Sequence, residues 1–207
     1  MYARTTTLRG NPRALDDAIR FVRDEWLPAT TDLPGCTGLS MLVGRRTGRC
    51  IVASGWADQQ AMLGSAEGMR RDRARLGQVL GAVPVVAQWE VAVIHRVQPT
   101  GPDACCRLTW SSRPDPLALD DDIATFRMTL LPRIEELTGF CSASLMVDRI
   151  SGRTVLAVAY ADRDAMLVAG QRADAVRAEY ARSMGGRITE VADLDMAVAH
   201  LRIPETV

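Results

Sequence analysis

Apolar residues along this chain follow helical spacing in some stretches and strand-like spacing in others, and the whole series occurs twice. The first apolar stripe has steps of four, three and four residues and consists of Leu15, Ile19, Val22 and Trp26. The second half contains a stripe with the same steps, namely Leu119, Ile123, Phe126 and Leu130. Such spacing places all members on one face of an amphipathic helix. We therefore expect two equivalent helices whose apolar faces belong to the core.

Each of these helices has a start signal and a later interruption. Asn11 and Asp115 directly precede a proline, which is typical of an N-cap followed by the first helical position. Pro28 and Pro132 come after the apolar stripes. Because proline lacks a backbone donor and clashes with the preceding turn, the regular helices should end or kink just before these two positions.

Extended segments surround the helices. Apolar runs predict strands over residues 2–8, 36–45, 49–56, 85–97, 141–149 and 153–160. Gly48 and Gly152 lie between consecutive runs at a turn position that tolerates positive φ, so these runs should pair as hairpins. The run 155–159 is apolar at every position, which indicates a strand covered on both faces.

A second helix is expected after each hairpin. Asp58 and Asp162 directly follow the hairpins and are good N-caps, for helices that extend through about Leu80 and Met184, respectively. Each half of the chain is then predicted to run strand, helix, strand, strand, helix, strand.

Residues 1 to 97 recur, imperfectly, as residues 106 to 202. The segment 57–63, with the pattern A-D-x-x-A-M-L, returns 104 positions later as segment 161–167. After one added residue the offset becomes 105, so that His95 corresponds to His200. An internal repeat of this length predicts two similar small domains. We assign residues 1–97 to the first repeat, 98–103 to a linker and 104–207 to the second repeat.

The composition is that of a globular protein. Of 207 residues, 47% are hydrophobic and 24% are charged, which argues against disorder. No apolar run approaches membrane-spanning length and the N-terminus lacks a secretory pattern, so we expect a cytoplasmic protein without a membrane partner. All basic residues are arginines, which excludes Schiff-base and P-loop lysine chemistry.

Charge and cysteine usage narrow the possible partners further. Residues 1–102 carry a net charge of +4 and residues 103–207 carry −4. This complementarity favours docking of the two halves on each other, whereas a nucleic-acid binder would more often present one strongly basic face. The five cysteines are an odd number without C-x-x-C spacing, so we expect reduced, mostly buried thiols and no metal site.

The predicted βαββαβ order, Pro34-Gly35 before the hairpin, and the motif Trp56-Ala-Asp-x-x-Ala-Met form a recognisable combination. It resembles the antibiotic-biosynthesis-monooxygenase-like (ABM) domains of the dimeric α+β barrel superfamily, over nearly the whole chain and twice. Members of that family usually pair as homodimers. The resemblance implies an α+β fold in which two ferredoxin-like βαββαβ repeats form an intramolecular pseudo-dimeric α+β barrel, with further oligomerisation left open.

Four residues are candidates for a site in such a fold. Trp56 matches the family's strand-end tryptophan and could wall an aromatic ligand, and Tyr160 replaces it in the second copy and could add a hydroxyl partner. His95 and His200 are the only histidines and hold equivalent strand positions, so one or both could act as a base near neutral pH. Core packing is the alternative for the aromatic residues, and a polar cap at a strand end is the alternative for the histidines.

Other polar residues are weaker candidates for a functional site. Arg45 and Arg149 could stabilise an anion, but they border the hairpin turns, where a solvated side chain is the simpler expectation. Asn11 is the only asparagine and already has a helix-cap role, whereas oxygenases and haem degraders of the family commonly use an asparagine near the strand-end tryptophan or on the first strand. Neither second helix contains a histidine, so the family's proximal haem ligand has no counterpart and haem degradation is disfavoured.

The resemblance leaves two functions open. The first is a cofactor-independent monooxygenase acting on an apolar or aromatic small molecule, which would hold a ring, take a proton and stabilise an oxyanion. In that case we expect one copy to keep the active site and the other to serve as its partner. The second is a non-catalytic small-molecule-binding or structural module of the same fold. Neither function calls for a cofactor.

Overall fold

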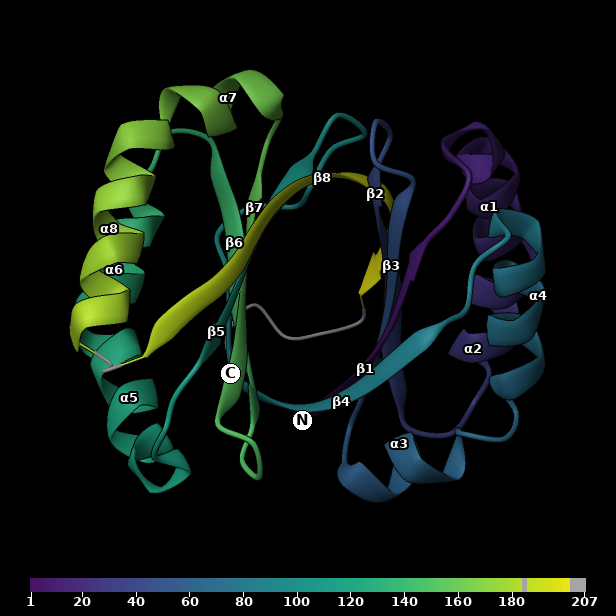
Figure 1. Cartoon of the computed structure of the whole chain (residues 1–207), viewed down its shortest axis with the longest axis horizontal. Coiled ribbons are helices and arrows are strands. Elements are labelled where there is room, and N and C mark those ends of the chain that lie inside the picture. The colour runs from purple at the N-terminus through teal and green to yellow at the C-terminus, as the bar shows by residue number, and fades with distance from the viewer. Residues whose placement is uncertain (184–185, 202–207) are drawn as a thin grey trace. The chain divides into compact units, whose positions relative to one another are not determined.

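The computed structural model describes residues 1–183 and 186–201 of the chain (Figure 1). These residues form two compact units. The first unit comprises residues 1–89 together with the segment that begins at Leu194, and the second comprises Glu90–Asp193. The compact units therefore divide the chain within two strands. The sequence-based boundaries at 97 and 104 describe the repeat and stay a prediction.

The elements of the first half follow the predicted order. They are β1 (Tyr2–Arg9), η1 (Pro12–Ala14), α1 (Leu15–Phe21), η2 (Val22–Trp26), α2 (Leu27–Thr31), β2 (Cys36–Gly44), β3 (Arg49–Trp56), α3 (Gln59–Gly64), α4 (Arg70–Leu80) and β4 (Val85–Arg96). Figure 1 shows α1, α2 and α4 together on one face of the strands β1, β2 and β3.

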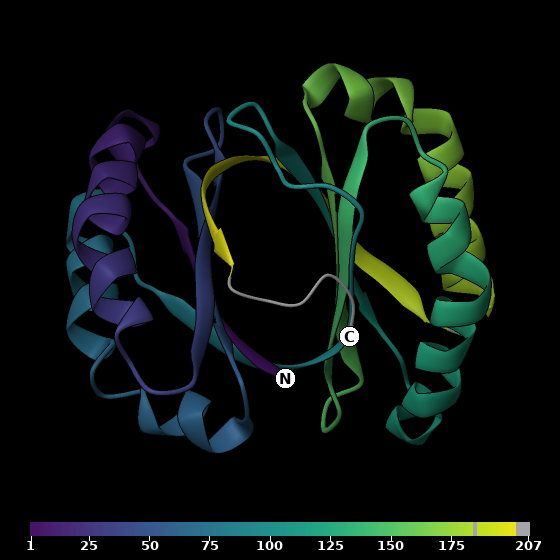
Figure 2. The ribbon, with the colours of Figure 1, turned by 180° about the vertical axis from the view of Figure 1, so that it is seen from behind.

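The second half has the same series of elements. They are β5 (Cys105–Ser112), η3 (Pro116–Ala118), α5 (Leu119–Thr125), η4 (Phe126–Leu130), α6 (Leu131–Glu135), β6 (Phe140–Asp148), β7 (Arg153–Tyr160), α7 (Arg163–Val168), α8 (Gly170–Ser183) and β8 (Arg187–Leu201). Seen from behind in Figure 2, α5, α6 and α8 cover one face of β5, β6 and β7. Among the described residues, no helix is long and apolar enough to span a membrane.

The strands pair in the order β1-β3-β2-β8-β5-β7-β6-β4, and this order closes on itself as a barrel. Within the first unit, β3 pairs antiparallel with β1 and β2, and the end of β8 extends this sheet beside β2. Within the second unit, β7 pairs with β5 and β6, and the end of β4 lies beside β6. The predicted fold class, two ferredoxin-like βαββαβ repeats in a pseudo-dimeric α+β barrel, is confirmed.

The first helix of each half starts and changes as its sequence predicts. The Asn11 side chain accepts a hydrogen bond from the Arg13 backbone N–H, and Asp115 accepts one from Leu117. The regular α-helix then ends, and five residues adopt π-helical geometry directly before the helices that contain Pro28 and Pro132. Proline has no backbone N–H to donate to the preceding turn. The π-helical turn before each proline lets the helix continue without this hydrogen bond.

The second helix of each half is interrupted, which the sequence analysis did not predict. Instead of one helix from Asp58 to about Leu80, α3 ends at Gly64 and α4 starts at Arg70. The intervening turn contains Gly68, and glycine weakens a helix because it loses more backbone entropy than other residues. The second half breaks between α7 and α8, and the predicted end at Met184 lies outside the described residues.

Each hairpin turns at a glycine in the left-handed region. Gly48 has a φ of +65°, and a Cβ placed on it would lie 2.0 Å from the carbonyl oxygen of Gly10. Gly152 has a φ of +68° and faces the carbonyl oxygen of Arg113 in the same way. Only glycine satisfies both the φ value and the close approach, which explains the predicted hairpin positions.

Two apolar clusters form the core, one between the helices and the sheet of each unit. The first contains Trp26, Trp56 and Met62, all at most 1% exposed. The second contains Phe126 and Tyr160, also at most 1% exposed. On β7, buried residues occur at both odd and even positions, as expected for a strand covered on both faces.

Asp148 supports the hairpin between β6 and β7, and its carboxyl gives a pH-dependent prediction. Burial raises the pKa of this carboxyl, but hydrogen bonds from Ser151 and Arg153 and from backbone N–H groups lower it to about 2. A pKa below the ordinary value of 3.8 stabilises the fold above that value, and the stabilisation is lost as the pH falls towards 2. We expect Asp148→Asn to be about 2 kcal/mol less stable than the wild type at pH 7. In urea unfolding at decreasing pH the difference should shrink below pH 4, whereas a constant difference would contradict this assignment.

Candidate functional site

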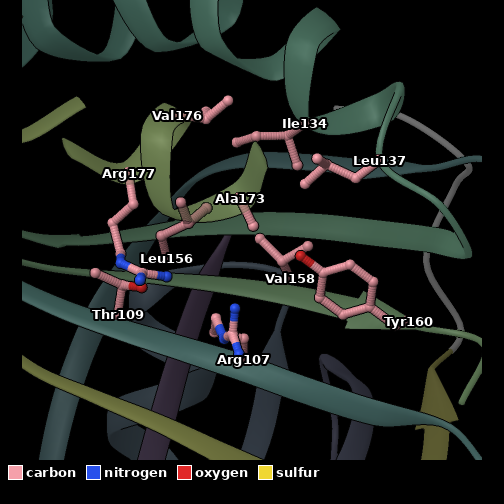
Figure 3. A pocket seen from close by; sticks show the side chains of 10 residues that line it. All are labelled: Arg107, Thr109, Ile134, Leu137, Leu156, Val158, Tyr160, Ala173, Val176 and Arg177. Carbon is pink, nitrogen blue, oxygen red and sulfur yellow. The ribbon is translucent and has the colours of Figure 1, made fainter. Parts of the chain in front are cut away.

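A cavity lies in the second unit between the helices and the sheet (Figure 3). The space in it that holds a water-sized sphere is about 30 Å³, and the empty volume reaches about 370 Å³ only when the part open to solvent is included. Strands β5 and β7 form one wall, and α6, the turn after it and α8 form the other. The apolar part of the lining consists of Ile134, Leu137, Leu156, Val158, Ala173 and Val176. The polar part consists of Arg107, Thr109, Tyr160 and Arg177.

Arg107 is the most constrained of these polar groups. Its Nε donates to Asp193 Oδ1 at 2.6 Å and its Nη2 donates to Asp193 Oδ2 at 2.8 Å, which is a two-pronged ion pair. The hydrogen bond to Asp193 raises the pKa of the guanidinium. The third nitrogen, Nη1, is buried and has no acceptor within hydrogen-bonding distance, and its ion pair with Asp174 Oδ1 is 3.8 Å long. Arg107 therefore presents one unused donor beside the cavity.

The remaining polar groups are paired or uncharged. Arg177 donates to Asp174 on the same helix. Burial raises the pKa of Tyr160 to about 12, so its hydroxyl is protonated at neutral pH and can donate a hydrogen bond. Thr109 is 4% exposed and contributes a small hydroxyl. The site thus combines a mostly apolar lining with hydrogen-bond donors from the strands and from α8.

The first unit has an arginine at the same place in its sheet. Arg4 pairs in register with Ser54, and Arg107 pairs with Val158, which lies 104 positions after Ser54. Arg4 is 2% exposed, and burial, followed by the nearby charge of Arg73, lowers its pKa. The two arginines are therefore equivalent positions of the first strand of each unit, both facing the helices.

Arg4 has hydrogen-bonding neighbours on the helical side of the sheet that Arg107 lacks. Arg4 donates to Ser65 Oγ at 2.8 Å and to the carbonyl oxygen of Met62, and its Nη1 contacts Met69 Sδ at 3.7 Å. The positions 104 residues after Ser65 and Met69 are alanines, Ala169 and Ala173.

The two segments differ in secondary structure, because residues 65–69 form a turn before α4 whereas α8 already begins at Gly170, but they share one backbone hydrogen bond. The Met69 N–H donates to the carbonyl oxygen of Ser65, and the Ala173 N–H donates to that of Ala169. The short Ala173 side chain lines the cavity of the second unit, whereas the longer Met69 side chain is buried in the core of the first.

Of the aromatic candidates, Tyr160 lies in the lining of this cavity. Trp56 is fully buried in the core of the first unit, where its Nε1 donates to Ser54 Oγ at 3.1 Å. Trp56 is not part of the lining of the cavity in the second unit. The ligand-contacting roles of both residues stay predictions.

The two histidines belong to different units and do not line the cavity. His95 Nε2 lies 3.1 Å from Glu135 Oε2, and its ring stacks on Phe140 with 6.1 Å between centroids. His200 pairs in register with Leu39 on β2. A catalytic role for either histidine stays a prediction.

The arginines near the hairpin turns have carboxylate partners. Arg149 donates to Glu90 and Asp120, and these hydrogen bonds raise its pKa. Arg45 donates to Asp16 at 2.9 Å. Both side chains are more than 40% exposed, so these ion pairs lie at the surface.

Two largely buried arginines were not predicted from the sequence, namely Arg107, which lines the cavity, and its counterpart Arg4 in the first unit. The register of the sheets relates them by 103 positions, whereas the short motifs recur at 104 and 105. A charged residue at an inward position of an otherwise apolar or hydroxyl-bearing strand was the available signal.

Within residues 1–183 and 186–201, no group of three or more metal-ligating side chains comes together. The five cysteines, all in the described part of the chain, are present as thiols, and four of them are buried. Burial raises the pKa of Cys50 to about 12, so its reactive thiolate form is disfavoured.

The fold has well-matched counterparts among solved structures. A "putative monooxygenase" from Lactobacillus acidophilus aligns with a TM-score of 0.68 and 12% identity, over 97% of this chain and 96% of that protein. An anthrone oxidase-like protein aligns with a TM-score of 0.64 and 12% identity, over 99% and 94%. A Listeria monocytogenes ferredoxin-fold protein related to antibiotic biosynthesis monooxygenases aligns with a TM-score of 0.52 and 6% identity, over 95% of each chain. At these identities the likeness establishes the ABM-like fold.

Sequence similarity identifies much nearer relatives. No family model matches the chain. The uncharacterised Mycobacterium tuberculosis protein Rv2557 is 40% identical over 207 residues, covering 100% of this chain and 92% of that protein. The uncharacterised protein Rv2558 of the same organism is 38% identical over 208 residues, covering 100% and 88%. The chain therefore belongs to the family of the mycobacterial proteins Rv2557 and Rv2558.

Proposed function

We propose that this protein binds an apolar or aromatic small molecule in the cavity of its second unit. The observation that carries the proposal is the cavity itself, whose mostly apolar lining includes a few hydrogen-bond donors. Binding sites for small molecules commonly combine a mostly apolar lining with a few polar groups that orient the ligand. The protein then has a monooxygenase-like fold and uses it to bind a ligand.

Cofactor-independent oxygenation needs a base in addition to an apolar cavity and hydrogen-bond donors. Such a reaction begins with removal of a proton from the substrate, so a base must lie within hydrogen-bonding reach of it. Among the described residues that line the cavity there is no carboxylate and no imidazole, and Tyr160 holds its proton up to about pH 12. Binding is for this reason the function that the lining supports best.

An unbiased capture experiment can identify the ligand. The purified protein is incubated with a cell extract and separated from it, and bound molecules are recovered for mass spectrometry. The variant Ala173→Met is treated in parallel, because it places in the cavity the side chain that Met69 contributes in the first unit. Gln171→Met is the matched control, since residue 171 is exposed on the same helix.

We expect one or more apolar molecules to be enriched on the wild type and on Gln171→Met, and to be lost from Ala173→Met. Loss of enrichment by about tenfold corresponds to about 1.4 kcal/mol of binding free energy, which is well within what blocking a slot achieves. Equal recovery from Ala173→Met and the wild type would show that the cavity is not the binding site.

A further inference from the structure

We propose that the cavity selects uncharged apolar molecules with a hydrogen-bond acceptor, that Arg107 Nη1 receives this acceptor, and that carboxylates are excluded. The inference rests on the proposed function, because it specifies which chemical class of ligand the same cavity takes. It makes Arg107 a specificity-determining residue. Three observations support it, and each concerns residues of the second unit or their counterparts in the first.

The first observation is that both guanidinium groups at the cavity already have carboxylate partners. Arg107 holds Asp193 through two hydrogen bonds, and Arg177 holds Asp174. A carboxylate that entered the slot would lose its hydration without meeting an unneutralised cation. Because desolvation of an ion is costly unless a new charge partner offsets it, an anionic ligand is disfavoured.

The second observation is the donor that these ion pairs leave unused. Arg107 lines the cavity (Figure 3), and its Nη1 is buried without a hydrogen-bond acceptor in the described part of the chain. A buried donor without an acceptor is unfavourable, and a neutral carbonyl or ether oxygen would satisfy it. Such an oxygen adds no charge to a site whose charges are already balanced.

The third observation comes from the first unit, which already contains an occupant of this kind. There Arg4 Nη1 donates to Ser65 Oγ at 2.8 Å, and the 2% exposed side chain of Met69 lies beside it with its Sδ 3.7 Å from the same nitrogen. Met69 is an uncharged, flexible apolar chain with one weak acceptor. Because Ala173 stands at the corresponding position of the second unit, the ligand should resemble the missing side chain in polarity and in where its acceptor lies.

The experiment uses two probes of equal length, 2-heptanone and heptanoate, with the full chain at pH 7 and isothermal titration calorimetry. We expect the wild type to bind 2-heptanone at least about tenfold more tightly than heptanoate. Ala173→Met should abolish 2-heptanone binding, whereas Gln171→Met should bind it like the wild type.

A second variant tests the charge argument directly. Asp193→Asn removes the two-pronged carboxylate partner of Arg107 and leaves only Asp174 at 3.8 Å, so heptanoate should gain affinity by about tenfold or more relative to 2-heptanone. An unchanged ratio between the two probes in Asp193→Asn would overturn the inference.

The remaining outcomes separate the inference from the proposed function. Wild-type binding of heptanoate that equals or exceeds binding of 2-heptanone would overturn the inference, while the cavity would stand as a binding site if Ala173→Met blocked it. Failure of both probes to bind would also overturn the inference. The extract experiment then decides independently whether the cavity binds any molecule.

Discussion

Replacement of Met69 by alanine is expected to lower the free energy of unfolding by about 2–5 kcal/mol and to create a second ligand cavity. Met69 is 2% exposed, belongs to the apolar core of the first unit and contacts the buried guanidinium of Arg4. Removing its side chain takes away buried apolar contacts and leaves a space beside Arg4, much as the cavity of the second unit lies beside Arg107. An apolar cavity of this origin in a rigid core can accept a small apolar molecule.

Two measurements check this expectation. Urea unfolding gives the change in stability, and titration with 2-heptanone gives the stoichiometry, which should rise from one to two molecules per chain. Met128→Ala is the matched control, because that methionine is 80% exposed and its truncation should change stability by no more than about 0.5 kcal/mol. A Met69→Ala protein that is destabilised but still binds one molecule would mean that the first unit collapses around the missing side chain.

Much of the fold could be predicted from local signals in the sequence. Apolar spacing and the Asn11 and Asp115 caps define the first helix of each half, and Gly48 and Gly152 define the hairpins. The interruption between α3 and α4 was missed because the Asp58 cap marks where the helical stretch starts and does not reveal a break within it. Its cause is local weakness around Gly64 and Gly68, together with the capping contact from Ser65 Oγ to the Met62 carbonyl oxygen.

The site was harder to predict than the fold, and the reason is physical. An arginine in a strand is expected to be solvated when only the sequence is known. Arg4 and Arg107 face inward because of the register of their sheets, which the sequence does not reveal. The cavity arises from a difference between two buried positions, Met69 and Ala173. Both residue types are ordinary in a core, so neither marks a site by itself. Only the comparison of equivalent positions reveals the difference.

Alanine substitutions at Trp56 and Tyr160 are expected to have similar effects on stability and different effects on ligand binding. Each side chain is at most 1% exposed, so each truncation should cost about 3–5 kcal/mol of unfolding free energy. Trp56 packs in the core of the first unit and also loses its hydrogen bond to Ser54, whereas Tyr160 lines the cavity of the second unit.

Calorimetric titration with 2-heptanone, at a temperature where both variants are folded, separates the two positions. Trp56→Ala should bind the probe within about twofold of the wild type, whereas Tyr160→Ala should bind about tenfold more weakly because one wall of the slot is missing. Equal losses at the two positions would argue that ligand contacts are shared between the units or that the losses reflect general destabilisation. Unequal losses would assign ligand binding to the second unit, and the first unit would then serve as the copy whose cavity its own methionine fills.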